Sequence, residues 1–440
     1  MKTSLVHRIL ALVIGVAAAL TAVQPAGAST LGDPSTDPFY RYTGSAPLES
    51  IEPGTVLRTR HLPYHLAGIP LPVRTTQLLF RTTGARGQAT LGVTTVVRPL
   101  LGAASRRVVA YQSFYDSSDP ADQPSSVIAG SMKLPGGAIA TFETGLVLPF
   151  LLAGSAVVIT DVEGQDANIG AGPEYGHNTL DGLRAAFANP TTGIAHEARV
   201  GMIGYSGGAI ATEWAAEMAP TYAPDVDRRL VGAAMGGVLV DPIRNLHYVD
   251  GTLLWAGVLP LALVGLGRAY DVDLTPYLSE RGLELTSKLR RATIAKALGQ
   301  YPGLTFAELV KPQYREPESI PELVEIANQL IMGKDGTPST PLFIGQGRRG
   351  EVEGASGSKP GIGPGDGIAI AGDVRTLART YCERGVDVLY HEYPLSHVGS
   401  VPIWTSQAVA WLGARLAGRA VPNNCATIKP GNVVEPVPVP

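Results

Sequence analysis

Residues 199–219 read Arg-Val-Gly-Met-Ile-Gly-Tyr-Ser-Gly-Gly-Ala-Ile-Ala-Thr-Glu-Trp-Ala-Ala-Glu-Met-Ala. A short apolar run at 200–203 precedes the glycine-flanked Ser206, and helix-forming residues follow it, so this order predicts a strand, a tight turn and a helix. A serine on such a turn needs small residues two positions before and after it, and both are glycine here. We therefore predict a nucleophile elbow with Ser206 as the nucleophile and the Gly207 N–H, at the helix N-terminus, as an oxyanion donor. The competing interpretation is a Gly-Ser turn without chemistry.

The N-terminus has the pattern of a secretory signal peptide. Basic Lys2 and Arg8 precede an apolar run at 9–20, and Ala26-Gly27-Ala28 provides a small-residue cleavage site. A membrane anchor fits this pattern less well, because the apolar run is short and Pro25 precedes the small residues. The sequence thus predicts a signal peptide at 1–28, cleavage after Ala28 and a secreted protein.

Composition narrows the class of protein further. A hydrophobic fraction of 45% with 17% charged residues predicts a well-packed globular protein, and a net charge of −3 offers no basic surface for nucleic acid. In an exported chain the two cysteines, Cys382 and Cys425, are expected to form one disulfide. Since no histidine and cysteine cluster has zinc-site spacing, we expect neither a metal nor a cofactor.

The order of segments predicts an α/β fold. After an irregular lead-in, three segments rich in Thr and Val, at 55–62, 73–82 and 90–98, indicate an antiparallel edge. Further strands, which then alternate with helices, are expected at 107–113, 155–160, 200–203, 230–235, 341–345 and 386–392. This alternation favours a mostly parallel central sheet with helices on both faces.

The interval between the strands at 230–235 and 341–345 is about a hundred residues, far longer than an ordinary crossover. We expect an inserted helical cap at 239–336, which divides the core into 29–238 and 337–420 and leaves a Pro/Val-rich tail, extended or loose, at 421–440. The apolar run at 253–267 is too short and too interrupted by Gly and Pro for a membrane span. It is either a buried core helix or a cap helix lining a lipid pocket, with Leu261 or Leu263 against the acyl chain.

A serine elbow needs a base and an acid that follow it in the chain. His397 lies in the loop after the last predicted strand, which is where the base of such an elbow belongs. The acid normally lies after the penultimate strand, in a loop that is unusually long here. Glu351, Glu353 and Asp366 all fit that position, and spacing alone leaves the three open.

Four motifs together resemble one known family. They are Tyr-Gln-Ser-Phe-Tyr-Asp-Ser at 111–117, Gly-Tyr-Ser-Gly-Gly at 204–208, Cys-Glu-Arg-Gly at 382–385, and Tyr-Pro at 393–394 ahead of the histidine. With these motifs the chain, from about Thr36 to Leu416, resembles the secretory lipases, which are α/β-hydrolases. The resemblance implies a lipase or carboxylesterase that acts on acylglycerols or related lipid esters, with transient contact between the cap and a lipid surface.

The resemblance also implies two site residues. The family's offset to the helical cysteine selects Asp366 as the acid, although a glycine-rich insertion separates it from the preceding strand here. Asp116, in the Tyr-Asp-Ser loop, matches the second oxyanion donor alongside Gly207; without the family, an ordinary Asp-Pro turn would explain that loop. An acyltransferase using the same acyl-enzyme and a non-catalytic lipid carrier remain alternatives. The sequence leaves acyl-chain preference and oligomeric state open.

Overall fold

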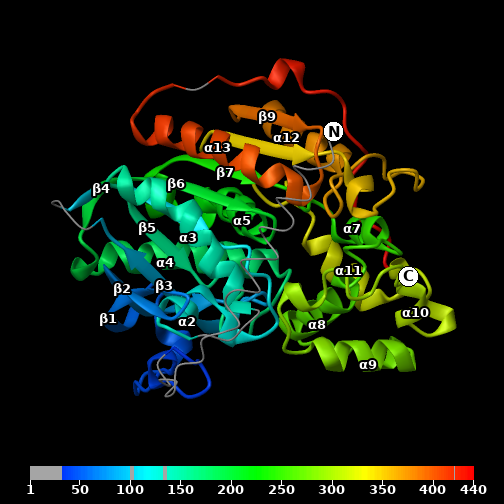
Figure 1. The fold of residues 1–440 in the computed structure, drawn as a ribbon, viewed down its shortest axis with the longest axis horizontal. Coiled ribbons are helices and arrows are strands. Elements are labelled where there is room, and N and C mark those ends of the chain that lie inside the picture. The colour runs from blue at the N-terminus through cyan, green and yellow to red at the C-terminus, as the bar shows by residue number, and fades with distance from the viewer. Residues whose placement is uncertain (1–31, 100–103, 132–135, 421) are drawn as a thin grey trace, which may run out of the picture.

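A computed structural model describes residues 32–99, 104–131, 136–420 and 422–440 (Figure 1). The predicted signal peptide lies outside these ranges. Within them the strands form one nine-stranded sheet in the order β1-β2-β3-β5-β4-β6-β7-β8-β9. The strands are β1 (Val56–Leu66), β2 (Ile69–Thr83), β3 (Ala89–Val97), β4 (Ser105–Gln112), β5 (Ala156–Thr160), β6 (Ile194–Tyr205), β7 (Leu230–Gly236), β8 (Leu342–Gly347) and β9 (Val388–Tyr393).

The sheet changes direction at β5. β1, β2, β3 and β5 pair antiparallel, whereas the pairs from β5 through β4, β6, β7 and β8 to β9 are all parallel. The antiparallel edge and the mostly parallel remainder are therefore as predicted. Parallel neighbours need a crossover, and helices between the strands provide it, which is the α/β-hydrolase architecture.

Some of the helices cover the two faces of the sheet, and others form a separate region at one end of it. The helices are α2 (Pro124–Ile128), α3 (Gly136–Leu152), α4 (Gly172–Ala188), α5 (Gly207–Tyr222), α6 (Pro224–Asp227), α7 (Pro242–Val249), α8 (Val258–Tyr270), α9 (Glu280–Leu289), α10 (Phe306–Leu309), α11 (Pro321–Gln329), α12 (Ala371–Glu383) and α13 (His397–Leu416). On β4, Val108 and Ala110 belong to the core cluster that includes residues of α4, α5 and α12, while Val109 and Tyr111 belong to the cluster on the other face, which includes residues of α3 and α13. Successive strand residues point to opposite faces, so an uninterrupted apolar strand requires both layers.

Helix α4 begins at Gly172, in a glycine-containing segment, whereas the sequence pattern alone predicts a helix only over 180–188. Glycines in its sequence lower helix propensity, but they let the helix pack closely. A methyl group on Gly172 would lie 2.1 Å from Trp214 Nε1, and one on Gly182 would lie 2.5 Å from Thr160 Oγ1. Packing against α5 and the sheet therefore outweighs local propensity. Helix α3 was not predicted.

Residues 237–341, between β7 and β8, form a helical region that we call the insert. It contains α7 to α11, which Figure 1 shows gathered at one end of the sheet. The insert has an apolar core of its own, which includes Leu246, Leu259, Leu285, Leu309 and Leu323. Among the described residues no helix is both long and apolar enough to cross a membrane.

The C-terminal tail, residues 422–440, is extended, which is one of the two forms expected from the sequence, and it is held by bonds to the core and to the insert. A disulfide joins Cys382 in α12 to Cys425, as predicted, with 5.6 Å between their Cα atoms. Farther along, Asn328 of α11 exchanges two hydrogen bonds with the backbone of Val437, at 2.8 and 2.9 Å. The tail thus runs from the core to the insert.

Candidate active site

Ser206 stands on a strained turn between β6 and α5. Its φ of 55° and ψ of −122° lie where residues other than glycine are rare. The flanking glycines are required sterically: a methyl group on Gly204 would lie 2.0 Å from the Gly208 carbonyl oxygen, and one on Gly208 would lie 2.2 Å from the Gln112 carbonyl oxygen. The sequence 204–208 therefore has the geometry of an elbow rather than of an ordinary turn.

His397 and Asp366 complete a hydrogen-bonded chain with this serine. His397 begins α13, and its Nε2 lies 2.9 Å from Ser206 Oγ. Its Nδ1 lies 2.8 Å from Asp366 Oδ2. The three residues are 8%, 3% and 0% exposed in the order serine, histidine, aspartate, so the chain is shielded from water. The structure thus brings together all three residues proposed from the sequence.

The backbone fixes the Asp366 carboxylate in place. Its Oδ1 accepts hydrogen bonds from the N–H groups of Ile368 and Ala369, at 3.1 and 2.8 Å. The Asp366 carbonyl in turn accepts the His397 N–H at 2.7 Å. Both the carboxylate and the backbone of this residue therefore orient the histidine, even though the long glycine-rich loop separates Asp366 from β8.

The other two candidate acids make different contacts. Glu351 is exposed and pairs with Arg349. Glu353 accepts the Val398 N–H at 2.9 Å and the Trp255 indole N–H at 2.7 Å. Trp255 packs edge-on against the His397 ring, with 5.1 Å between the ring centroids. Glu353 therefore supports the surroundings of the histidine instead of binding its ring nitrogen, a role that sequence spacing did not reveal.

The electrostatic surroundings of His397 favour its charged form. Burial alone would lower the pKa of the imidazole, but the charge and hydrogen bond of Asp366 outweigh it, with smaller contributions from Glu353 and Asp116, and the pKa is raised. A base that takes a proton from a serine hydroxyl must become a buried cation. These carboxylates stabilise that cation.

Asp116 and Gly207 meet beside the serine. Asp116 has a left-handed φ of 34°, and a methyl group on Gly207 would lie 1.8 Å from Asp116 Oδ1. Burial raises the pKa of Asp116 to about 6, against the lowering effects of His397 and the Gly207 N–H. Among the described residues none accepts a hydrogen bond from the Asp116 N–H. The two predicted oxyanion donors therefore lie together, next to Ser206.

A buried glutamate that the sequence analysis missed supports the Asp116 loop from the core. Glu143 of α3 accepts the Phe114 N–H and the Tyr111 hydroxyl, each at 2.9 Å, and also the Ser113 hydroxyl. Burial raises its pKa to about 7. Glu143 is the one charged residue of α3, which could have indicated a buried role. Its partners could not be predicted, because they lie some thirty residues away in the chain.

A cavity of about 130 Å³ opens at this site, and its polar lining includes Ser206, Gly207, Asp116 and, from the insert, Asn245. Most of its lining is apolar and comes from the insert. Along α8 the lining residues are Val258, Ala262 and Leu266, four apart and therefore on one face of the helix. Leu261 and Leu263 pack in the core of the insert, so for these two residues the alternative of a buried core helix holds and the alternative of contact with an acyl chain does not.

Comparison with known families identifies the chain. Residues 132–424 match the family described as "Secretory lipase". The chain belongs to the secretory lipase family. Its fold is that of the lipase and esterase α/β-hydrolases.

Two relatives and one solved structure illustrate the range of this secretory lipase family. The trichothecene C-3 esterase of Fusarium sporotrichioides is 33% identical over 400 residues, covering 86% of this chain and 83% of the relative. A probable inactive lipase of Mycobacterium tuberculosis is 30% identical over 393 residues, covering 88% and 83%. Candida antarctica lipase A, in its closed state, has a TM-score of 0.76 at 24% identity, covering 92% of this chain and 91% of that one. Because one of these relatives is described as inactive, family membership alone does not establish activity. Activity is therefore inferred from the residues of the site.

The one group of described residues that could hold a metal is separate from the serine site of this secretory lipase. It consists of His247, Glu316 and Glu318 of the insert, whose ligand atoms lie within 4.8 Å of one another. His247 Nε2 is 2.7 Å from Glu318 Oε1, and this contact raises the pKa of the histidine. The group shares no residue with the Ser206 chain.

Proposed function

We propose that this secretory lipase is a secreted serine hydrolase that cleaves acylglycerols or related lipid esters through an acyl-enzyme. The observation that carries the proposal is the hydrogen-bonded chain from Asp366 through His397 to Ser206 at the mouth of an apolar cavity. A nucleophile, a base and an orienting acid in this order are the requirements of acyl transfer.

In the first half-reaction Ser206 Oγ attacks the ester carbonyl carbon as its proton passes to His397 Nε2. The carbonyl oxygen becomes an oxyanion, which the Gly207 and Asp116 N–H groups stabilise; each such donor contributes about 2.7 to 4 kcal/mol. The tetrahedral intermediate collapses, the bond to the alcohol oxygen breaks, and His397 returns its proton to the departing alcohol. The product is the acyl ester of Ser206.

In the second half-reaction a water molecule replaces the alcohol. His397 removes a proton from the water as its oxygen attacks the acyl carbon, and a second oxyanion forms between the same donors. Collapse releases the carboxylic acid and returns the proton to Ser206. Throughout both steps Asp366 keeps the Nδ1–H tautomer of His397 in place and stabilises the imidazolium.

The insert acts in this proposal as a cap that supplies the acyl-chain site. Apolar side chains of α8, with Ile169 and Ile210 of the core, line the cavity. Each acyl methylene buried there contributes roughly 0.8 kcal/mol to binding. Esters with long acyl chains therefore gain affinity that short-chain esters lack.

Exposed apolar side chains near His397 fit transient contact with a lipid surface. Leu253, Val352 and Val398 are 63%, 69% and 55% exposed. Leu253 packs against Gly354, and Val398 is bonded to Glu353, so the three residues surround one short segment of the glycine-rich loop. Secretion is part of the same proposal, supported by the signal-peptide pattern at 1–28 and by the disulfide.

The test measures hydrolysis of a chain-length series of soluble p-nitrophenyl esters and of a triacylglycerol emulsion. Wild type is compared with Ser206→Ala and with the exposed-serine control Ser356→Ala. We expect hydrolysis to be lost only in Ser206→Ala. Release of fatty acid in water, rather than transfer to an added alcohol, separates a hydrolase from an acyltransferase. Lipid binding without hydrolysis in the wild type would refute the proposal in favour of a carrier.

A further inference from the structure

The Asp116–Ser117 peptide is held from two sides. Asp116 has a left-handed φ of 34°, a conformation that a non-glycine residue keeps only when its surroundings fix it. On the core side the buried Glu163 carboxylate accepts the Ser117 N–H, at 3.2 Å from each oxygen. On the insert side the Ile294 N–H donates to the Asp116 carbonyl oxygen at 2.8 Å. This peptide plane cannot rotate without losing both bonds.

The insert continues the contact along a short antiparallel bridge. Ser117 lies opposite Thr293, and the Ser118 N–H donates to the Ala292 carbonyl at 3.0 Å. The Ser118 hydroxyl also donates to the Leu289 carbonyl at 2.7 Å. Residues 289–294 of the insert therefore pair with the Asp116 loop much as a neighbouring strand would.

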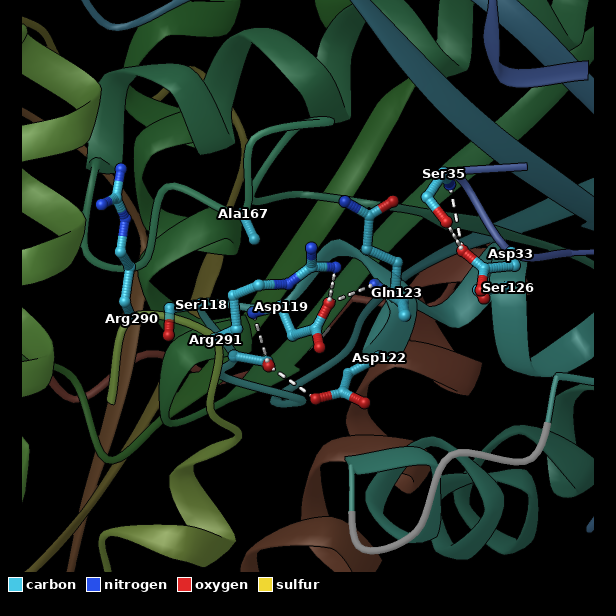
Figure 2. A network of polar contacts seen from close by, with 12 residues as sticks. Asp33, Ser35, Ser118, Asp119, Asp122, Gln123, Ser126, Ala167, Arg290 and Arg291 are labelled. Carbon is cyan, nitrogen blue, oxygen red and sulfur yellow. Dashed lines mark hydrogen bonds and ion pairs between the residues drawn. The ribbon is translucent and has the colours of Figure 1, made fainter. Parts of the chain in front are cut away.

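Two arginines of the insert, Arg291 and Arg268, reinforce this pairing, and Figure 2 shows Arg291. Arg291 extends toward Asp119, with 2.8 Å between its Nη2 and Oδ1. Arg268 of α8 donates from Nη1 to the carbonyls of Ser118 and Ala167, each at 3.1 Å, and from Nη2 to the Arg290 carbonyl at 2.8 Å. A guanidinium fork that binds carbonyls of both the core and the insert fixes their separation at this point.

We propose that residues 289–294 of the insert position the oxyanion hole. The insert then influences the rate of the chemical step, in addition to lining the acyl site. The proposal rests on the oxyanion role of Asp116 in the proposed function. By holding the Asp116 carbonyl, the Ile294 N–H fixes the backbone on the C-terminal side of the residue whose own N–H faces the oxyanion. Displacing the insert would misplace that donor by a fraction of an ångström or more, which transition states tolerate poorly.

Ile294→Pro is the most direct test, because it removes the one N–H that holds Asp116. Ile294 is the first residue of a 3₁₀ turn, Ile294–Lys296, where proline is favoured. Thr293 before it has φ −71° and ψ 154°, the extended conformation that a residue preceding proline adopts. Ile294→Ala is the matched variant, since it keeps the N–H but loses the side chain that lines the cavity.

The readouts are kcat and KM for p-nitrophenyl acetate, the inhibition constant of a trifluoromethyl ketone, and the thermal unfolding midpoint. Relative to Ile294→Ala, we expect Ile294→Pro to lower kcat roughly 10- to 100-fold, with KM within about threefold. The ketone should lose affinity by the same factor, because its adduct carries an oxyanion. Equal kcat and ketone affinity in the two variants would overturn the proposal.

A second pair keeps the test decisive if Ile294→Pro does not fold. Arg268→Gln removes the guanidinium clamp, and Arg281→Gln removes an exposed arginine of α9 that pairs with Glu284. We expect kcat about tenfold lower in Arg268→Gln than in Arg281→Gln, and equal values would refute the positioning role. Ester hydrolysis that survives Ser206→Ala would instead overturn the proposed function itself, so the two failures are distinguishable.

Discussion

The two halves of the serine site are held by different parts of the molecule. Ser206 follows β6, Asp366 lies in the loop between β8 and α12, and His397 follows β9, so the two hydrogen bonds of the chain join core residues. The insert touches this half through Trp255, which packs against the His397 ring. Asp116 follows β4 but lies between a core glutamate and the insert. A movement of the insert would therefore break the hydrogen bond that holds the oxyanion half, whereas in the other half it would remove a packing contact of His397 and neither hydrogen bond of the chain.

Asp366→Asn makes the largest change, and it acts on the core half only. The amide cannot hold the imidazole in the required tautomer or stabilise its cation, so we expect kcat to fall by about 10⁴-fold with the fold intact. Steady-state kinetics measure kcat, and circular dichroism checks that the fold is intact. Glu351→Gln, which alters an exposed acid of the same loop, is the control. Near-normal turnover in Asp366→Asn beside a collapse in Glu353→Gln would move the acid to the earlier position.

Sequence patterns predicted the core half of the site well. The glycines around Ser206, the position of His397 after the last strand, and the apolar strands with their intervening helices all follow from local rules of sterics and periodicity. The identity of the acid does not follow from local rules, because the loop at 348–367 contains three acids. The path of this loop depends on tertiary contacts such as the hydrogen bond from the Gly350 N–H to the Gly365 carbonyl. Family resemblance, rather than spacing, selected Asp366.

The sequence predicted the insert far less completely. Its helices bury faces against one another, so residues such as Leu261 and Leu263 gave no sign of whether they face a ligand or a neighbouring helix. The bridge between Ser117 and Thr293 joins positions far apart in the chain, and a local sequence pattern cannot predict such a pairing. The same holds for the buried Glu143 and Glu163, whose partners include the backbone N–H groups of Phe114 and Ser117 in the Asp116 loop.

Removal of the disulfide tests whether the tail supports either half. Cys382 and Cys425 are 43 residues apart, and closing a loop of that size typically stabilises a protein by about 2 to 4 kcal/mol. We expect the free energy of unfolding of Cys382→Ser/Cys425→Ser to be lower than that of wild type by this amount. Its kcat at 25 °C should stay within about twofold of wild type. Denaturant unfolding and kinetics on p-nitrophenyl acetate provide the measurements. A large loss of kcat in folded protein would show that the tail also positions the site.

Glu143→Gln changes the core-side support of the Asp116 loop. The carboxylate accepts three hydrogen bonds, whereas the amide replaces one acceptor oxygen with a donor and leaves a buried donor without a partner. We expect a loss of about 1 to 3 kcal/mol in unfolding free energy and a lower kcat. Comparing the fall in kcat with that of Ile294→Pro would show which side holds the loop more firmly. An unchanged kcat would mean that the insert alone suffices.

Glu213→Gln is the smallest change, and it concerns a part of α5 that serves stability and not the reaction. Glu213 and Glu217 are both buried one turn apart, and the Tyr381 hydroxyl donates to both. Glu217 also accepts the backbone N–H groups at 333, 335 and 336. Burial and the charge of Glu217 raise the pKa of Glu213 well above its ordinary value. The folded state therefore keeps a proton there that the unfolded chain loses near pH 4.3.

This difference makes stability depend on pH with a definite sign. Stability from Glu213 is complete below the unfolded pKa and declines as the pH rises through the window up to the raised folded pKa, because the folded state binds the extra proton. Glutamine does not titrate, so the stability of Glu213→Gln relative to wild type should rise between pH 5 and pH 8, by up to about 1.4 kcal/mol per pH unit, with Glu325→Gln as an exposed control. Denaturant unfolding across that range measures the gain, and kcat should not change. A difference between variant and wild type that stays constant from pH 5 to pH 8 would show that Glu213 is already charged in the folded protein.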